Sequence, residues 1–193
     1  SRCLYGAQLS VIIGFCAAGI ATVVSVVIGI LSGYLGGRFD MIMQRLVDAW
    51  MSFPDLVVLI VVVSVVGPGL VPIICILGLL LGINGSRIIR GATISVRENM
   101  YVSAAQSMGA TLPRILIRHV LPNVMPPIII LFTTRVGFVI LAESGLSFLG
   151  LGVPPPAPTW GGMLFEASAS LGDFPWLLVP SGGTLALTIL SFG

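Results

Sequence analysis

The chain has 193 residues, of which 56% are hydrophobic and only 8% are charged, whereas an average soluble domain carries about 25% charged residues. Its mean hydropathy of +1.12 excludes a water-exposed globular surface and places the chain in lipid. All nine basic side chains are arginine, so the net charge of +2 arises without the lysine that a phosphate-binding P-loop requires.

The first predicted transmembrane span runs from about residue 9 to residue 35, because no charge occurs between Arg2 and Arg38. A helix of that length would measure roughly 40 Å, enough to cross a bilayer with some tilt. Small residues recur every four positions along this span, which lets another helix backbone approach closely. We expect this ladder to contact a helix of the same chain or a partner subunit; it consists of Ala17, Ala21, Ser25, Gly29, Gly33 and Gly37.

A second uncharged run, between Asp55 and Arg87, is too long for one crossing. The sequence Gly67-Pro68-Gly69 predicts a tight turn inside it, with spans at about 49–66 and 70–88. Two further spans are predicted at about 124–143 and from Trp176 to the end of the sequence.

The predicted fold class is therefore an all-α, polytopic membrane helix bundle with about five spans. We expect residues 1–193 to form a single membrane domain that lacks an N-terminal span and the C-terminal end, so that the full chain has six spans.

The distribution of arginine predicts the orientation of the spans. If residues 89–123 form a cytoplasmic loop, seven arginines lie at or near the cytoplasmic side, as the positive-inside rule requires. The turn at Gly67 and an extracytoplasmic loop at 144–175 then contain no basic residue. The seven are Arg38, Arg45, Arg87, Arg90, Arg97, Arg114 and Arg118.

The sequence contains no recognisable catalytic or metal-binding pattern. There is no HExxH, CxxC or GxSxG motif, and His119 is the only histidine, which excludes a multi-histidine metal site within this chain. The three cysteines are dispersed. We therefore predict no catalytic residue, no metal and no cofactor bound by this chain, and no nucleic-acid partner.

Two ionisable residues fall within or beside the predicted fourth span. Arg135 and Glu143 lie eight residues apart and so roughly on one face of a helix. Intramembrane charge is costly, which makes both residues functional candidates. We consider two roles for them, in lining a transport pathway or in forming a structural pair.

The most polar segment of the chain, residues 101–123, is predicted to form a helix-turn-helix. Residues 101–109 are alanine-rich and favour a helix, which Gly109 ends. A second helix begins with proline near its first turn, carries Arg114 and Arg118, and ends at Leu121-Pro122. The hairpin either docks a partner protein or lies in the membrane interface without one.

This segment resembles the coupling motif of ABC importer permeases, in which Glu-Ala-Ala is followed by glycine and then by Leu-Pro. Ala104, Ala105, Gly109 and Leu121-Pro122 match at the family spacing, whereas Ser103 replaces the usual glutamate. His119 resembles the variant of peptide and nickel permeases. Further stretches similar to that subfamily are Gly6-Ala7-Gln8-Leu9-Ser10, Gly36-Gly37-Arg38-Phe39-Asp40, Arg97-Glu98, Arg118 to Asn123, Leu141 to Gly152 and Pro154 to Gly161.

The resemblance implies a permease subunit of a binding-protein-dependent importer of di- and oligopeptides in the cytoplasmic membrane of a bacterium or archaeon. Its expected partners are a second homologous permease, two cytoplasmic ATPases that hold ATP and magnesium, an extracytoplasmic solute-binding protein and membrane lipid. The expected ATPase-coupling residues are Ser103, Ala104, Ala105, Gly109, Arg114, Arg118, Leu121 and Pro122.

On the extracytoplasmic side, Trp160, Glu166 and Asp173 are the predicted contacts to the binding protein. An importer of nickel, glutathione or another small solute is the alternative function within the same family. A membrane scaffold without transport is a more distant one.

Overall fold

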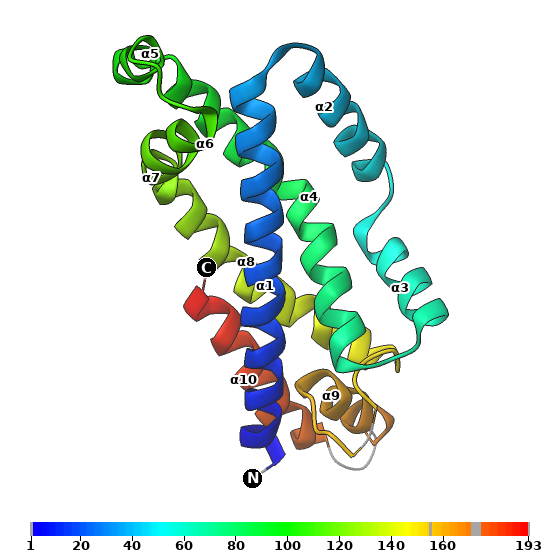
Figure 1. Ribbon diagram of the computed structural model, residues 1–193. Helices are drawn as coiled ribbons and strands as arrows, with labels where there is room; N and C mark the ends of the chain where they lie inside the picture. Colours follow the sequence, from blue (N-terminus) through cyan, green and yellow to red (C-terminus); the bar gives the residue numbers. More distant parts are fainter. Residues whose placement is uncertain (1, 155, 171–174, 193) are drawn as a thin grey trace. The chain divides into compact units, whose positions relative to one another are not determined.

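The computed structural model describes residues 2–154, 156–170 and 175–192, and every regular element in these ranges is helical. The helices group into two compact units. Unit 1 comprises Ser1–Ile20, Pro54–Gly78 and Thr133–Gly193, and unit 2 comprises Ala21–Phe53 and Leu79–Phe132. Both units receive residues from three long helices, α1 (Arg2–Leu35), α4 (Leu70–Arg97) and α8 (Met125–Phe148) (Figure 1).

Helices α1, α4 and α8 are each long and apolar enough to cross a membrane. They confirm the predicted spans at 9–35, 70–88 and 124–143, although α1 already begins at Arg2, α4 continues to Arg97 and α8 continues to Phe148. The last predicted span corresponds to α10 (Leu178–Phe192), a shorter apolar helix of 15 residues. It follows a single 3₁₀ turn at Pro175–Leu177.

The predicted continuous span at 49–66 is wrong. The chain instead forms α2 (Gly37–Met51) and α3 (Asp55–Val66), which are bent by 79° at the break between them. Pro54 explains the break, because its ring disfavours helical backbone at the preceding residue. The 12 residues of α3 extend only about 18 Å, so α2 and α3 together make at most one broken span.

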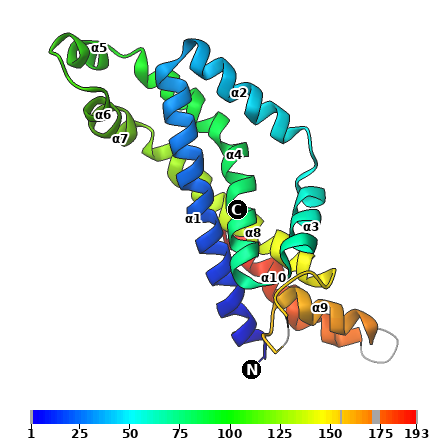
Figure 2. The same cartoon turned by 45° about the vertical axis from the view of Figure 1, so that its right-hand side comes forward.

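Unit 1 contains α3, α9 (Trp160–Ala169) and α10 together with the first part of α1 and the last part of α8. Phe15 of α1 stacks edge-on against Phe192 of α10 at 5.9 Å between ring centroids. Gly67, with a φ of +97°, forms the predicted turn between α3 and α4. Both views place this turn, the start of α1 and α9 at one end of the unit (Figures 1 and 2).

Unit 2 is organised by close packing between α1 and α4. A Cβ atom on Gly29 would lie 2.7 Å from the carbonyl oxygen of Ser86, and one on Gly33 would lie 2.8 Å from that of Arg90. Ser25 adds a hydrogen bond, because its Oγ donates to the Gly82 carbonyl oxygen at 2.7 Å.

The small-residue ladder therefore serves packing within the chain at these positions. Gly37 does not belong to the seam, because it begins α2 and a Cβ there would meet nothing within 4 Å.

This packing predicts different outcomes for two valine substitutions in the same helix. Gly29→Val forces the backbones of α1 and α4 apart, and overpacking of this kind costs about 1–3 kcal/mol. Gly19→Val is the matched control, because a Cβ at Gly19 meets nothing within 4 Å. We expect a lower midpoint of heat-induced aggregation for the first variant in detergent and little change for the second. Equal midpoints would contradict the close α1–α4 seam.

Candidate functional site

The predicted helix-turn-helix is present in unit 2. Its first helix is α5 (Met100–Ser107), and its second begins as α6 (Leu112–Ile115), widens to a π-helical turn at Leu116–Val120 and ends as α7 (Leu121–Asn123). Gly109 has a φ of +76°, a left-handed conformation that favours glycine, so it reverses the chain between the two helices. Both views place α5 at the same end of unit 2 as the turn from α1 to α2 (Figures 1 and 2).

Helix α5 has one buried face and one exposed face. Val102 and Ala105 are only 0% and 3% exposed, and Val102 belongs to the hydrophobic core of unit 2. Tyr101, Ala104 and Met108 are exposed, and their spacing places them on one side of the helix. The small side chain of Ala105 therefore packs inward, and its part in a docking surface stays a prediction.

Two exposed methionines next to α5 were not singled out from the sequence. Met100 is 89% exposed and Met108 is 81% exposed, and they flank the exposed Ser103 and Ala104. Flexible, polarisable methionine side chains are common at protein-binding surfaces. The available signal was the position of Met100 and Met108 at the two ends of the alanine-rich segment.

The second helix of the hairpin presents its arginines to the outside. Arg114 and Arg118 are exposed, whereas Ile115 and Val120 are buried in the core of unit 2. Pro122 has no N–H group to donate to the carbonyl four residues before it, and such a missing bond distorts a helix. The wide π-turn falls in this segment, where π-turns are frequent at functional sites.

A tyrosine joins the hairpin to two long helices. Tyr34, near the end of α1, is 7% exposed. Its hydroxyl oxygen accepts a hydrogen bond from Gln106 Nε2 of α5 at 2.8 Å. The guanidinium carbon of Arg97, the last residue of α4, lies 5.9 Å from the centre of the tyrosine ring, within cation–π range. The ends of α1 and α4 and the first helix of the hairpin therefore meet at one side chain.

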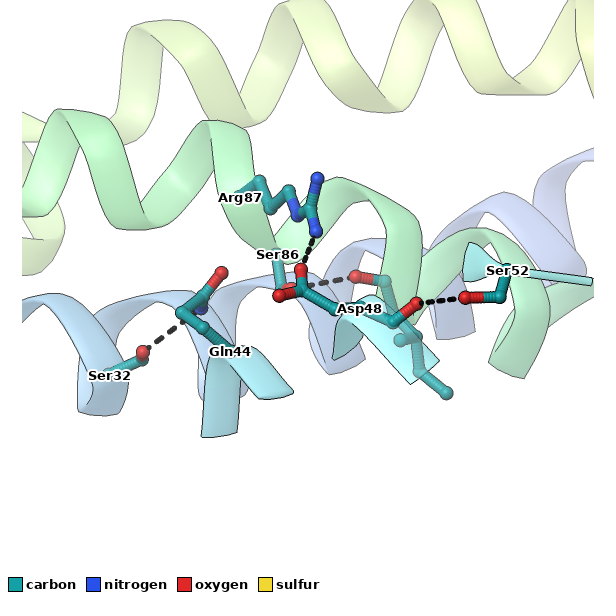
Figure 3. A network of polar contacts seen from close by, with 7 residues as sticks. Ser32, Gln44, Asp48, Ser52, Ser86 and Arg87 are labelled. Carbon is teal, nitrogen blue, oxygen red and sulfur yellow. Dashed lines mark hydrogen bonds and ion pairs between the residues drawn. The ribbon is translucent and has the colours of Figure 1, made fainter. Parts of the chain in front are cut away.

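Helix α2 is joined to α4 by two ion pairs of different burial. Arg90 binds both carboxylate oxygens of Asp40, and the two side chains are 30% and 17% exposed. Arg87 binds Asp48, and these side chains are 44% and 46% exposed. Figure 3 shows Arg87 reaching Asp48 and, nearby, Gln44 of α2 donating to Ser32 of α1. The polar side of α2 thus faces other helices of unit 2.

The three predicted contacts to a binding protein are placed differently. Trp160 is 3% exposed and its Nε1 donates to the Cys3 carbonyl oxygen at 3.1 Å, so its side chain is covered within unit 1 and its contact to a binding protein stays a prediction. Glu166 is exposed and pairs with Arg2 at 3.2 Å. Asp173 lies outside the described residues.

Arg135 and Glu143 are both buried in unit 1, at 9% and 0% exposure. Eight helical residues separate them by about 12 Å along the axis, which is too far for a direct salt bridge. Glu143 instead accepts a hydrogen bond from Ser147. The described residues contain no group of three or more His, Cys, Asp or Glu side chains that could hold a metal ion.

Residues 25–192 match the family described as "Binding-protein-dependent transport system inner membrane component". The chain belongs to this family. The family description and the apolar helices α1, α4 and α8 confirm the predicted location in the cytoplasmic membrane. They also agree with the resemblance noted in the hairpin.

Three bacterial relatives match nearly the whole chain. The oligopeptide transport system permease protein OppC of Bacillus subtilis is 37% identical, over 99% of this chain and 63% of the relative. The dipeptide permease DppC of Alkalihalophilus pseudofirmus is 34% identical, over 100% and 63%. The glutathione permease GsiD of Pectobacterium atrosepticum is 33% identical, over 100% and 64%. The chain thus spans just under two thirds of their length.

The fold is also similar to that of a chain of the MetNI methionine ABC transporter, solved in inward-facing conformations. The TM-score is 0.80, and the alignment covers 99% of this chain and 91% of that chain at 15% sequence identity. At this identity the similarity establishes the fold.

The two ion pairs between α2 and α4 predict unequal coupling energies. In a double-mutant cycle, Asp40→Asn with Arg90→Gln should give a coupling above about 1 kcal/mol, because the pair is largely buried and makes two hydrogen bonds. Asp48→Asn with Arg87→Gln should give less than about 1 kcal/mol, because that pair is half exposed. Thermal stability of the purified protein measures both. A larger coupling for the Asp48 pair would refute this ranking.

Proposed function

We propose that the chain is the membrane subunit of an ATP-driven, binding-protein-dependent importer of di- and oligopeptides. The observation that carries this proposal is the exposed face of α5, where Ala104 lies between the projecting side chains of Met100 and Met108. This small and apolar surface stands on a hairpin that otherwise exposes arginine. Together with the family membership of the chain, it supports a role in docking a cytoplasmic ATPase.

In the proposed mechanism, α5 sits in a cleft of the ATPase and moves with it as ATP binds and is hydrolysed. ATP and magnesium are held by two such ATPases, and a second, homologous permease completes the transport pathway. A substrate-loaded binding protein docks on the opposite face of the membrane. The cycle is one of alternating access, in which the bound states of the partners shift the populations of two permease conformations.

Contacts inside unit 2 support the transmission of this movement. Val102 fixes the inner face of α5 to the hydrophobic core, and Gln106 binds Tyr34 of α1. Because Arg97 of α4 lies on the same tyrosine ring, a displacement of α5 acts on both long helices. A movement of the hairpin would therefore be transmitted to α1 and α4.

The charge distribution supports the proposed orientation. The seven arginines assigned to the cytoplasmic side all belong to unit 2, whereas Arg2 and Arg135 are the arginines of unit 1. The positive-inside rule then places the hairpin in the cytoplasm. Exposed residues of unit 1 around Glu166 would face the binding protein.

Peptides are the proposed substrates because relatives named for oligopeptide and dipeptide transport match the whole chain. The relative named for glutathione is 33% identical, and glutathione is itself a modified tripeptide. It is therefore the second candidate substrate. Reconstitution of the full-length protein with its partner permease, both ATPases and its binding protein, followed by uptake of a labelled dipeptide, tests the proposal directly.

Substitutions on the exposed face of α5 should uncouple ATP hydrolysis from uptake. Ala104→Arg places a large charged side chain on the exposed face of α5, and Gly109→Arg places one in the turn that follows. Both substitutions should lower substrate-stimulated ATPase activity at least tenfold while membrane insertion of the permease persists. Gly109→Asn is the control, because asparagine tolerates left-handed backbone and remains small. Full stimulation in Ala104→Arg would refute the assignment of this surface, and co-purification of the ATPases reports docking itself.

Loss of the Tyr34 hydroxyl should alter coupling more than stability. Tyr34→Phe removes one hydrogen bond, worth about 0.5–1.5 kcal/mol, and preserves the aromatic ring under Arg97. We expect fewer peptides imported per ATP hydrolysed, with the ATPases still bound. Ser107→Ala is the control, because Ser107 Oγ bonds only the carbonyl of Ser103 within α5. An unchanged ratio of uptake to hydrolysis would exclude Tyr34 from the transmission path.

A further inference from the structure

A buried carboxyl group in unit 1 is surrounded by serine hydroxyls. Glu143 of α8 is 0% exposed, as is Ser10 of α1, and Ser144 and Ser147 are 3% and 6% exposed. Ser147 Oγ donates to Glu143 Oε1 at 2.6 Å, and the hydroxyls of Ser10 and Ser144 also lie beside the carboxyl group. These four residues are called the Glu143 cluster below.

Half of this cluster has no hydrogen-bond partner among the described residues. Glu143 Oε2, Ser10 Oγ and Ser144 Oγ are all buried, and none of them completes a hydrogen bond. Buried polar atoms are normally paired, and an unpaired group in a folded protein requires an explanation such as an absent ligand. Three unpaired oxygens around one carboxyl group therefore define a site that an additional group could fill.

The backbone around the cluster is held tightly in place. Gly161 packs directly against the backbone of Ser144, and Gly152 packs against Ser147, so that a Cβ atom at either glycine would collide with its neighbour. The backbone at Ser144 and Ser147 is thus held in place beside the carboxyl group.

A cavity adjoins the cluster through Ser147. This side chain is shared between the hydrogen bond to Glu143 and the wall of a cavity of about 450 Å³. Arg2, Thr159 and Glu166 line the same cavity. Its volume lies within the range of small-ligand sites, and Ser147 belongs both to this cavity and to the Glu143 cluster.

The chemistry of the three free oxygens matches a primary ammonium group. Such a group carries three hydrogen-bond donors and one positive charge, and the cluster presents three acceptors around one carboxylate. A water molecule supplies only two donors and no charge. Charge also favours a cation, because an intramembrane carboxylate is stabilised by an opposite charge.

We propose that the Glu143 cluster binds the N-terminal ammonium group of a peptide that enters from the adjoining cavity. This inference rests on the proposed function as a peptide importer and adds a recognition site within the membrane subunit. The exposed Glu166 is a poorer candidate, since it already pairs with Arg2 and is open to water. Glu143 is a substrate-contacting residue in this proposal, and Ser10 and Ser144 complete its set of acceptors.

The test compares uptake of trialanine and N-acetyltrialanine by the reconstituted full-length importer. Glu143→Gln keeps the shape of the side chain and removes its charge, whereas Glu166→Gln is the matched control on the same cavity. The binding protein is common to all variants, so its own preference cancels when each variant is compared with the wild type. We expect the preference for trialanine to fall at least tenfold in Glu143→Gln and to be unchanged in Glu166→Gln. An equal preference in wild type and Glu143→Gln overturns the inference.

A second measurement does not depend on delivery by the binding protein. Saturation-transfer NMR follows trialanine binding to the permease–ATPase complex in nanodiscs, without binding protein and with vanadate present. Signal in the wild type that is lost in Glu143→Gln supports the site, and an unchanged signal overturns it. A high-resolution density map gives a further check. A map that shows only a water molecule in the Glu143 cluster, both with and without trialanine, also overturns the inference.

The serines provide the test if Glu143→Gln does not assemble. Ser144→Ala and Ser10→Ala each remove one acceptor and keep the charge, so each should reduce the preference for trialanine several-fold, and no change in either overturns the inference. Failure of the proposed function has a separate signature. In that case the wild-type importer takes up neither probe, which refutes peptide import and the ammonium site together.

Discussion

The close approach of α1 and α4 determines the arrangement of unit 2. Lipid offers no partner for a polar side chain, so contact between these helices must come from fitted surfaces and internal hydrogen bonds. Gly29 and Gly33 bring the two backbones together, and Ser25 bonds across the seam. Because the helices are locked in register there, Tyr34 and Arg97 at their ends come together beside the hairpin. The hairpin therefore rests on closely packed helices.

The same constraint explains why α2 has its polar side toward the protein. Asp40 and Asp48 bind arginines of α4, while Ile42 and Leu46 on the same helix are 61% and 63% exposed. In a water-soluble protein this pattern would be reversed. Here the apolar side is compatible with lipid, and the ion pairs are formed on the side that faces α4. The two ion pairs therefore attach α2 to α4.

Two surfaces of the chain, one in each unit, have a chemistry that suits contact with other molecules. The exposed face of α5 is small and apolar, as shape-based docking requires. The cavity in unit 1 adjoins the Glu143 cluster and its unpaired oxygens, as recognition of a charged substrate requires. In the proposed importer the first surface contacts an ATPase and the second contacts the peptide.

The sequence by itself determined the class of protein, the approximate positions of the long helices, the arginine-rich side and the hairpin, because apolar run length, proline and glycine act locally. It did not reveal the break at Pro54, which lies inside the span predicted at 49–66. Only the tertiary structure decided which sides of the helices are buried. Ala105 faces inward and Trp160 is covered, while Ser10 and Glu143 meet across 133 positions of sequence. The burial of these side chains depends on contacts with residues that are distant in the sequence, and no local sequence pattern specifies those contacts.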